Sequence, residues 1–177
     1  MPKRVEVRIC GYGGQGVVLA GQILGKAAVY DGKSALQTQY YGAEARGSLV
    51  RSEVIISDSR IGFPAVRKCD ILVAMNQESL NKFLKDLKED GILMVDSTNV
   101  ETITSTKAET FKIPATEIAE KMFGESTYAN MVMLGALTKI TKIVTAKSVE
   151  KAVKESVSEK TVKDNLNAYK EGYVLRV

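Results

Sequence analysis

The sequence predicts a three-layer, Rossmann-like α/β domain with a mainly parallel sheet and extra helices at the C-terminus. Strand and helix patterns alternate through roughly the first two thirds of the chain, as in folds where helices pack on a sheet. Two strand patterns, residues 70–75 and 92–95, are apolar without a break, as expected for strands covered on both faces. The 177 residues, 45% hydrophobic and 26% charged, suit one globular domain that spans residues 1–177.

The first strand pattern leads directly into a glycine-rich turn and a helix. Alternation along residues 5–9 predicts a strand whose apolar side chains face the core, while Glu6 and Arg8 point outward. The turn Gly11-Tyr12-Gly13-Gly14-Gln15-Gly16 follows, and a helical pattern then runs from Val17 to the Asp31-Gly32 break. Because glycines let the backbone turn sharply and a helix N-terminus presents free N–H groups, this order predicts a site for an anion, most often a phosphate.

The remaining elements are predicted in chain order. Residues 33–39 and 49–57 form two strand patterns, and if they pair as a hairpin they are antiparallel and the sheet is mixed. Pro114 stops a last, edge-like strand and suits the start of a helix. Further strands are predicted over residues 70–75, 92–95 and 110–113, and helices over residues 76–87, 115–123, 128–141, 148–157 and 160–169.

The composition argues against several classes of function. The chain has no histidine and two cysteines, Cys10 and Cys69, which we expect to be buried thiols. This argues against a structural zinc site, a self-contained iron–sulfur cluster and a histidine-based catalytic centre. The net charge of +4, with acids between the lysines, does not match a nucleic-acid-binding surface. The apolar runs are too short to span a membrane, and the N-terminus lacks an apolar signal region, so we expect a cytoplasmic protein.

The glycine turn matches the pattern G-x-G-x-x-G and leaves three interpretations open: a nicotinamide dinucleotide site, a site for another phosphate-bearing ligand, or close helix–sheet packing alone. A dinucleotide site needs an acid at the tip of the second strand to hold the ribose. That tip is Gln39-Tyr40-Tyr41, which carries no acid. No Gly-Lys-Ser or Gly-Lys-Thr follows the turn, so a Walker-type site is not indicated.

Three further stretches contain candidate residues. The loop Tyr41-Gly42-Ala43-Glu44-Ala45-Arg46-Gly47 either holds an internal Glu44–Arg46 ion pair or contacts a ligand or neighbouring subunit. The sequence Asp96-Ser97-Thr98 follows a predicted parallel strand, at the edge where open α/β sheets bind ligands, but it suits a turn or helix cap without any such role. Asn130 stands at a predicted helix entry, where it can act as a cap.

Four segments resemble one known family when they are taken in order. They are GYGGQGVVLAGQILGKAA, QYYGAEARGS, DILVAMNQESL and NMVMLGAL. Together they resemble the gamma subunits of 2-oxoacid:ferredoxin oxidoreductases, the 2-oxoglutarate type in particular, and the resemblance covers essentially the whole chain. It implies a cytoplasmic complex that decarboxylates a 2-oxo acid and transfers the acyl group to coenzyme A.

The resemblance also implies where the cofactors and partners lie. Thiamine diphosphate and the iron–sulfur clusters would belong to partner subunits (alpha, beta and, in some members, delta), and ferredoxin would take the electrons. This chain would hold no metal and no catalytic side chain, and would help to form the coenzyme A site. Whether it forms a homodimer in isolation, and which 2-oxo acid is used, stay open.

The site residues that the resemblance implies fall in two groups. The expected coenzyme A contacts are Gly11, Gly13, Gly14, Gln15, Gly16 and Asn130, and the expected interface or active-site loop contains Tyr41, Gly42, Glu44 and Arg46. Two alternatives remain: a stand-alone NAD(P)-binding oxidoreductase of Rossmann type, and a purely structural subunit whose glycine turn serves packing.

Overall fold

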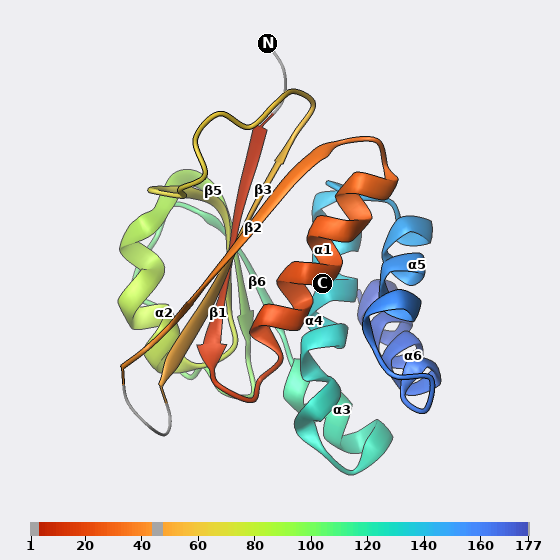
Figure 1. The fold of residues 1–177 in the computed structure, drawn as a ribbon. Coiled ribbons are helices and arrows are strands. Elements are labelled where there is room, and N and C mark those ends of the chain that lie inside the picture. Colours follow the sequence, from red (N-terminus) through yellow and green to blue (C-terminus); the bar gives the residue numbers. More distant parts are fainter. Residues whose placement is uncertain (1–3, 44–47, 177) are drawn as a thin grey trace.

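A mixed sheet of six strands, in the order β2-β3-β1-β4-β5-β6, forms the centre of the described chain (Figure 1). The computed structural model describes residues 4–43 and 48–176. β3 is antiparallel to both β1 and β2, whereas β1, β4, β5 and β6 pair in parallel. The predicted hairpin and the mainly parallel, mixed sheet are therefore confirmed. The strands are β1 Arg4–Tyr12, β2 Ser34–Tyr41, β3 Leu49–Ser57, β4 Cys69–Ala74, β5 Leu87–Asp96 and β6 Glu109–Ile113.

Helices cover both faces of the sheet and give the three layers that the sequence predicts (Figure 1). One face packs on a core that includes side chains of α1, α3, α4, α5 and α6, and the other on a smaller core formed with α2 and the segments around Val66 and Val100. The C-terminal helices therefore enlarge one layer only. The helices are α1 Val17–Tyr30, α2 Gln77–Phe83, α3 Ala115–Phe123, α4 Ala129–Thr141, α5 Ala146–Ser156 and α6 Val162–Val174, with short 3-10 turns η1 Leu84–Asp86 and η2 Ser126–Tyr128.

The helix predicted over residues 76–87 is shorter than expected. α2 ends at Phe83, η1 follows, and β5 begins at Leu87 and not at residue 92. Leu87 fits the apolar spacing of the helix, but its backbone pairs with Cys69 of β4. Pairing with β4 therefore decides the secondary structure of Leu87, which fits both the helix pattern and the strand pattern.

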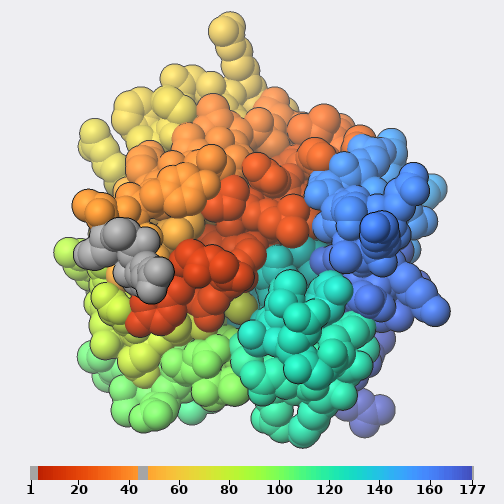
Figure 2. All heavy atoms as spheres, turned by 60° about the horizontal axis from the view of Figure 1, so that its bottom comes forward, coloured from red at the N-terminus to blue at the C-terminus, as the bar shows by residue number. Residues whose placement is uncertain are grey.

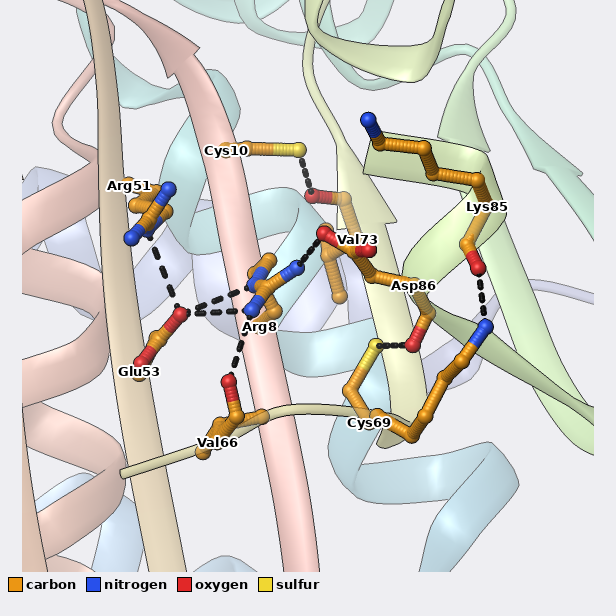
Figure 3. A network of polar contacts seen from close by, with 10 residues as sticks. Arg8, Cys10, Arg51, Glu53, Val66, Cys69, Val73, Lys85 and Asp86 are labelled. Atoms are coloured by element: carbon orange, nitrogen blue, oxygen red, sulfur yellow. Dashed lines mark hydrogen bonds and ion pairs between the residues drawn. The ribbon is translucent and has the colours of Figure 1, made fainter. Parts of the chain in front are cut away.

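Arg8 does not point outward, and this prediction is wrong. Its side chain and that of Glu53 on β3 are each 3% exposed, and the Arg8 Nη2 to Glu53 Oε1 distance is 2.7 Å. Arg8 also donates to Asp86 of η1 and to the carbonyl of Val66, 3.0 Å away (Figure 3). A second arginine, Arg51, places its Nε 3.2 Å from the same Glu53 oxygen. We call Arg8, Arg51, Glu53 and Asp86 the arginine cluster.

The arginine cluster lies on the α2 face of the sheet, where burial and charge act against each other. Burial disfavours the charge on Arg8, but Glu53 and Asp86 outweigh burial and raise the pKa of its guanidinium. Cys10 and Cys69 lie on the same face, and both are buried as predicted. Burial raises the pKa of each thiol to about 12, so both are neutral at ordinary pH.

Candidate functional site

The glycine turn joins β1 to α1 at the carboxyl edge of the sheet. Gly14 and Gly16 adopt positive φ angles of 96° and 70°, a conformation that glycine reaches without strain. Gly11 lies inside β1, because the strand continues to Tyr12. A Cβ on Gly11 would lie 2.7 Å from Gln15 Oε1, so this glycine makes room for the Gln15 side chain. The turn itself is therefore Gly13–Gly16.

The Gln15 side chain fastens the turn to the end of β4. Its Oε1 accepts hydrogen bonds from the Tyr12 amide at 2.7 Å and from Asn76 Nδ2 at 2.9 Å. Its Nε2 donates to the carbonyl of Met75 at 3.2 Å. Asn76 is also the N-cap of α2, since its Oδ1 accepts from the Ser79 amide. Gln15 therefore holds the turn in place with its side chain.

The amides of the turn divide into those already bonded and those left over. Gly13 N donates to Ser48 O and Gln15 N donates to Tyr12 O, each at 3.1 Å. Within the described residues, the amides of Gly14 and Gly16 have no hydrogen-bond acceptor. In the part of the chain that the structure describes, α1 has no side-chain cap and no acid in its first turn, so these residues do not compensate the positive end of the helix. The leftover donors suit an anion.

A polar pocket opens beside the turn at the carboxyl ends of the parallel strands. Its volume is ≈ 210 Å³. Figure 2 shows this side of the molecule, where the glycine turn (red) lies next to α3 and the start of α4 (blue-green). Open α/β sheets bind ligands at this edge. The pocket is lined by Gly14, Gln15, Met75, Asn99, Thr116, Glu120, Ser126 and Ala129.

Four polar members of this lining were not singled out from the sequence. Asn99 follows β5, Thr116 and Glu120 lie on α3 after β6, and Ser126 belongs to η2. For Asn99 and Thr116, a place shortly after a parallel strand was the available signal, since such strands end at one edge of the sheet. Glu120 and Ser126 carry no such signal. Asp96, one of the candidate residues from the sequence, has a structural role. Its buried carboxylate accepts hydrogen bonds from Thr116 Oγ1, Asn99 Nδ2 and the amides of residues 98 and 116.

Asn130 lies against the turn. Its Nδ2 donates to the carbonyl of Gly16 at 3.2 Å, and its Oδ1 accepts from the Met131 amide at 2.9 Å. A Cβ on Gly16 would lie 2.2 Å from Asn130 Nδ2, so the two residues are closely fitted. Asn130 is 4% exposed and therefore contacts the turn from the protein interior. Its expected contact with a ligand stays a prediction.

The hairpin between β2 and β3 ends beside the glycine turn. Ser48 O accepts from Gly13 N, and Gly42 N donates to Leu49 O at 2.9 Å. Tyr41 is 64% exposed at the end of β2. Glu44 and Arg46 lie outside the described residues. The described end of this loop at Ser48 therefore lies beside the glycine turn, and the role of the loop at an interface or active site stays a prediction.

The strand order weakens the nicotinamide dinucleotide interpretation. In dinucleotide-binding folds, the strand after the first helix lies next to the first strand and brings the ribose-binding acid to the turn. Here β3 separates β2 from β1. The tip of β2 is therefore displaced by one strand, in addition to carrying no acid.

Residues 4–43 and 48–176 contain neither a metal-binding cluster nor a membrane-spanning helix. No group of three or more His, Cys, Asp or Glu side chains there could hold a metal ion. No helix of this part of the chain is long and apolar enough to cross a membrane.

Comparison with known proteins gives relatives along almost the whole chain. The family model described as pyruvate ferredoxin/flavodoxin oxidoreductase matches residues 6–175. The 2-oxoglutarate synthase subunit KorC of Methanocaldococcus jannaschii is 49% identical over 173 residues, which are 96% of this chain and 92% of that protein.

Two solved structures have the same fold. The keto/oxoacid ferredoxin oxidoreductase gamma subunit from Geobacter sulfurreducens PCA superposes with a TM-score of 0.85 at 42% identity, and the match covers 96% of both chains. The 2-oxoglutarate:ferredoxin oxidoreductase from Magnetococcus marinus, with 2-oxoglutarate, coenzyme A and succinyl-CoA bound, gives a TM-score of 0.86 at 20% identity. That match covers 96% of this chain and 30% of the other, and it shows the fold alone. The chain belongs to the pyruvate ferredoxin/flavodoxin oxidoreductase family.

Proposed function

We propose that the chain is the gamma subunit of a cytoplasmic 2-oxoacid:ferredoxin oxidoreductase of the 2-oxoglutarate type, and that its glycine turn binds the pyrophosphate of coenzyme A. The name of the Methanocaldococcus relative supports the 2-oxoglutarate assignment. The presence of coenzyme A in the Magnetococcus enzyme supports the choice of coenzyme A as the ligand. The reaction would convert the 2-oxo acid anion and coenzyme A to acyl-CoA, carbon dioxide and a proton, with two electrons passed to ferredoxin.

The free amides of the turn are the observation that carries the coenzyme A proposal. A pyrophosphate needs several N–H donors and a backbone that it can approach closely. Among residues 4–43 and 48–176, the amides of Gly14 and Gly16 are unpaired, and no atom lies within 4 Å of the place where a Cβ on Gly14 would stand. The uncapped positive end of α1 points to the same place. The turn therefore fits a pyrophosphate.

The pocket beside the turn can hold another part of the same ligand. Glu120 offers a hydrogen-bond acceptor, and Ser126 offers both a donor and an acceptor. Asn99 Nδ2 is bonded to Asp96 and Thr116, so Asn99 offers its Oδ1 as an acceptor. Coenzyme A carries amides, hydroxyls and an adenine amino group that such side chains can bind. The turn and the pocket share Gly14 and Gln15, so one extended molecule can contact both.

The rest of the catalytic machinery would belong to partner subunits. Thiamine diphosphate supplies the carbanion chemistry of decarboxylation when it is bound there. The two cysteines of this chain do not fit an iron–sulfur cluster, because both are buried and burial holds their thiols neutral. The chain's own residues therefore bind and orient coenzyme A, while the iron–sulfur clusters lie in other subunits.

Reconstitution tests this proposal. The chain is co-expressed with its partner subunits, and 2-oxo acids are assayed one at a time for coenzyme A-dependent ferredoxin reduction. We expect activity in the complex, the highest kcat/KM with 2-oxoglutarate, and no activity of the chain alone.

Two results would overturn it. One is turnover of 2-oxoglutarate by the isolated chain. The other is a complex assembled without this chain that keeps the same KM for coenzyme A.

A further inference from the structure

The two edges of the sheet differ in how they are protected. The edge strand β6 is short, contains Glu109 and Lys112, and is followed by Pro114, which are the usual protections against pairing with another strand. The other edge strand, β2, has eight residues, SALQTQYY, with no charge, proline or glycine. Its register with β3 runs from Ser34 to Tyr41 without a bulge. β2 is therefore an open edge.

Alternate residues of β2 direct their backbone groups away from the sheet. Gly42 N donates to Leu49 O, and these two residues are opposite each other in the β2–β3 register. In an antiparallel pair, bonded residues alternate with residues whose N–H and C=O point the other way. The even-numbered residues of β2 therefore bond to β3. The outward-pointing backbone groups belong to Ala35, Gln37, Gln39 and Tyr41.

We propose that a second copy of this chain covers this edge, with the two β2 strands antiparallel about a two-fold axis that passes through Thr38. This register pairs Ala35 with the partner's Tyr41 and Gln37 with the partner's Gln39, so all four outward-pointing residues are bonded. In two strands related by such an axis, a given residue lies on the same face of the sheet in both copies. Odd-numbered residues therefore pair with odd-numbered ones, and even-numbered residues with even-numbered ones. The two six-stranded sheets would become one continuous sheet.

The side chains of β2 are complementary to themselves in this register. A small side chain, Ala35, faces a large one, Tyr41, and an uncharged strand brings no like charges together at the axis. Within the described residues, the Thr38 hydroxyl has no hydrogen-bond partner. Two threonines opposite each other can bond through their hydroxyls after rotation about Cα–Cβ.

A groove beside β2 receives the partner's most exposed aromatic ring. The groove, of ≈ 570 Å³, runs between α1 and β2, and its lining includes Val29, Tyr30 and Ala35. Val29 is 55% exposed and Tyr41 is 64% exposed. Ala35 and Tyr41 have the same parity, so the partner's Tyr41 opposite Ala35 points to the side of the sheet where α1 lies. Contact between these exposed apolar groups would add to the backbone pairing.

Sedimentation of the full chain, with β2 variants, tests this inference. The wild-type chain should be a dimer. Gln39→Pro removes one outward N–H from each copy and leaves the β2–β3 bonds intact, so it should raise the dimer dissociation constant about 30-fold, equivalent to two backbone hydrogen bonds. Gln39→Thr keeps the N–H and should stay dimeric. Far-UV circular dichroism checks that each variant is folded.

Cross-linking tests the register without depending on the proline variant. Thr38 pairs with itself in a non-hydrogen-bonded position, where Cα atoms are about 4.5 Å apart and a disulfide can form. Thr38→Cys should give a disulfide-linked dimer on oxidation, whereas Leu36→Cys, which faces the partner's Tyr40, should not. A monomeric wild-type chain, an unchanged dimer in Gln39→Pro, or equal cross-linking of the two cysteine variants would overturn the proposal. It does not depend on coenzyme A binding, so the two proposals can fail separately.

Discussion

Strand β1 carries two polar regions that differ in what remains unpaired. In the middle of the strand, Arg8 is buried and bonded to Glu53, Asp86 and the carbonyl of Val66. At its end, the glycine turn keeps the amides of Gly14 and Gly16 without acceptors in the described chain. The paired region stabilises the fold, and the unpaired region is available to a ligand. Binding capacity thus lies where donors are left over, not where charge is concentrated.

Physical chemistry explains why the two regions cannot exchange roles. A buried charge must be paired by the protein itself, because water cannot reach it. A free amide at a solvent-exposed turn costs little, since water bonds to it until a ligand arrives. This contrast can be tested by removing a paired group, by filling the turn, and by titrating the buried thiols on the α2 face of the sheet.

Removal of the Glu53 charge should have the largest effect on stability. Glu53→Gln leaves Arg8 buried beside a neutral side chain, and we expect the free energy of unfolding to fall by about 3–5 kcal/mol. Urea denaturation measures this change. The matched control is Glu89→Gln, whose partner Lys107 is 78% exposed, and it should change stability by less than about 0.5 kcal/mol. Equal effects of the two variants would contradict the structural role of the arginine cluster.

Filling the turn should have an intermediate effect that depends on which glycine is changed. Both Gly14→Ala and Gly16→Ala place alanine at positive φ. A Cβ at residue 16 would lie 2.2 Å from Asn130 Nδ2, whereas a Cβ at residue 14 meets no described atom within 4 Å. Gly16→Ala should therefore be less stable than Gly14→Ala by roughly 1–3 kcal/mol. Thermal unfolding of the two variants checks the difference. Identical stabilities would mean that Asn130 does not support the turn.

The stability of the α2 face of the sheet should depend on pH through its two buried thiols. Burial raises the pKa of Cys10 and of Cys69 to about 12, while an unfolded thiol titrates near 8.5. The unfolded chain therefore loses these protons first, and the stabilisation is complete below about pH 8.5 and declines as pH rises towards 12. Between pH 8.5 and 9.5 the two thiols should account for a loss of about 2 kcal/mol. Replacing both cysteines by alanine should reduce this slope, and an unchanged slope would contradict the assignment.

Most of the fold could be predicted from local patterns, because each element has its own periodicity. The hairpin of β2 and β3, the buried strands and the glycine turn are all present in the structure. The error at Leu87 arose because one apolar residue satisfied both helix and strand spacing. The burial of Arg8 could not be predicted, since its partner Glu53 is 45 residues away and is recognised only once β1 and β3 pair.

The candidate site was predictable in part. The glycine turn has a local signature, and the amides that it leaves free follow from backbone geometry. The pocket has no local sequence signature, because Asn99, Thr116 and Glu120 come close to the turn only when four parallel strands end at one edge of the sheet. Gln15 was expected to contact the ligand, and the structure shows that its side chain is bonded to Tyr12, Met75 and Asn76.

Calorimetric titration of coenzyme A into the assembled complex tests the central claim most directly. Gly14→Ala places a methyl group in the open turn, and Gly32→Ala is its matched control, since Gly32 also has positive φ and open space but lies beyond the far end of α1. We expect the wild-type and Gly32→Ala complexes to bind coenzyme A equally, and Gly14→Ala to bind at least about tenfold more weakly, the equivalent of about 1.4 kcal/mol. Equal affinity in all three complexes would contradict the account.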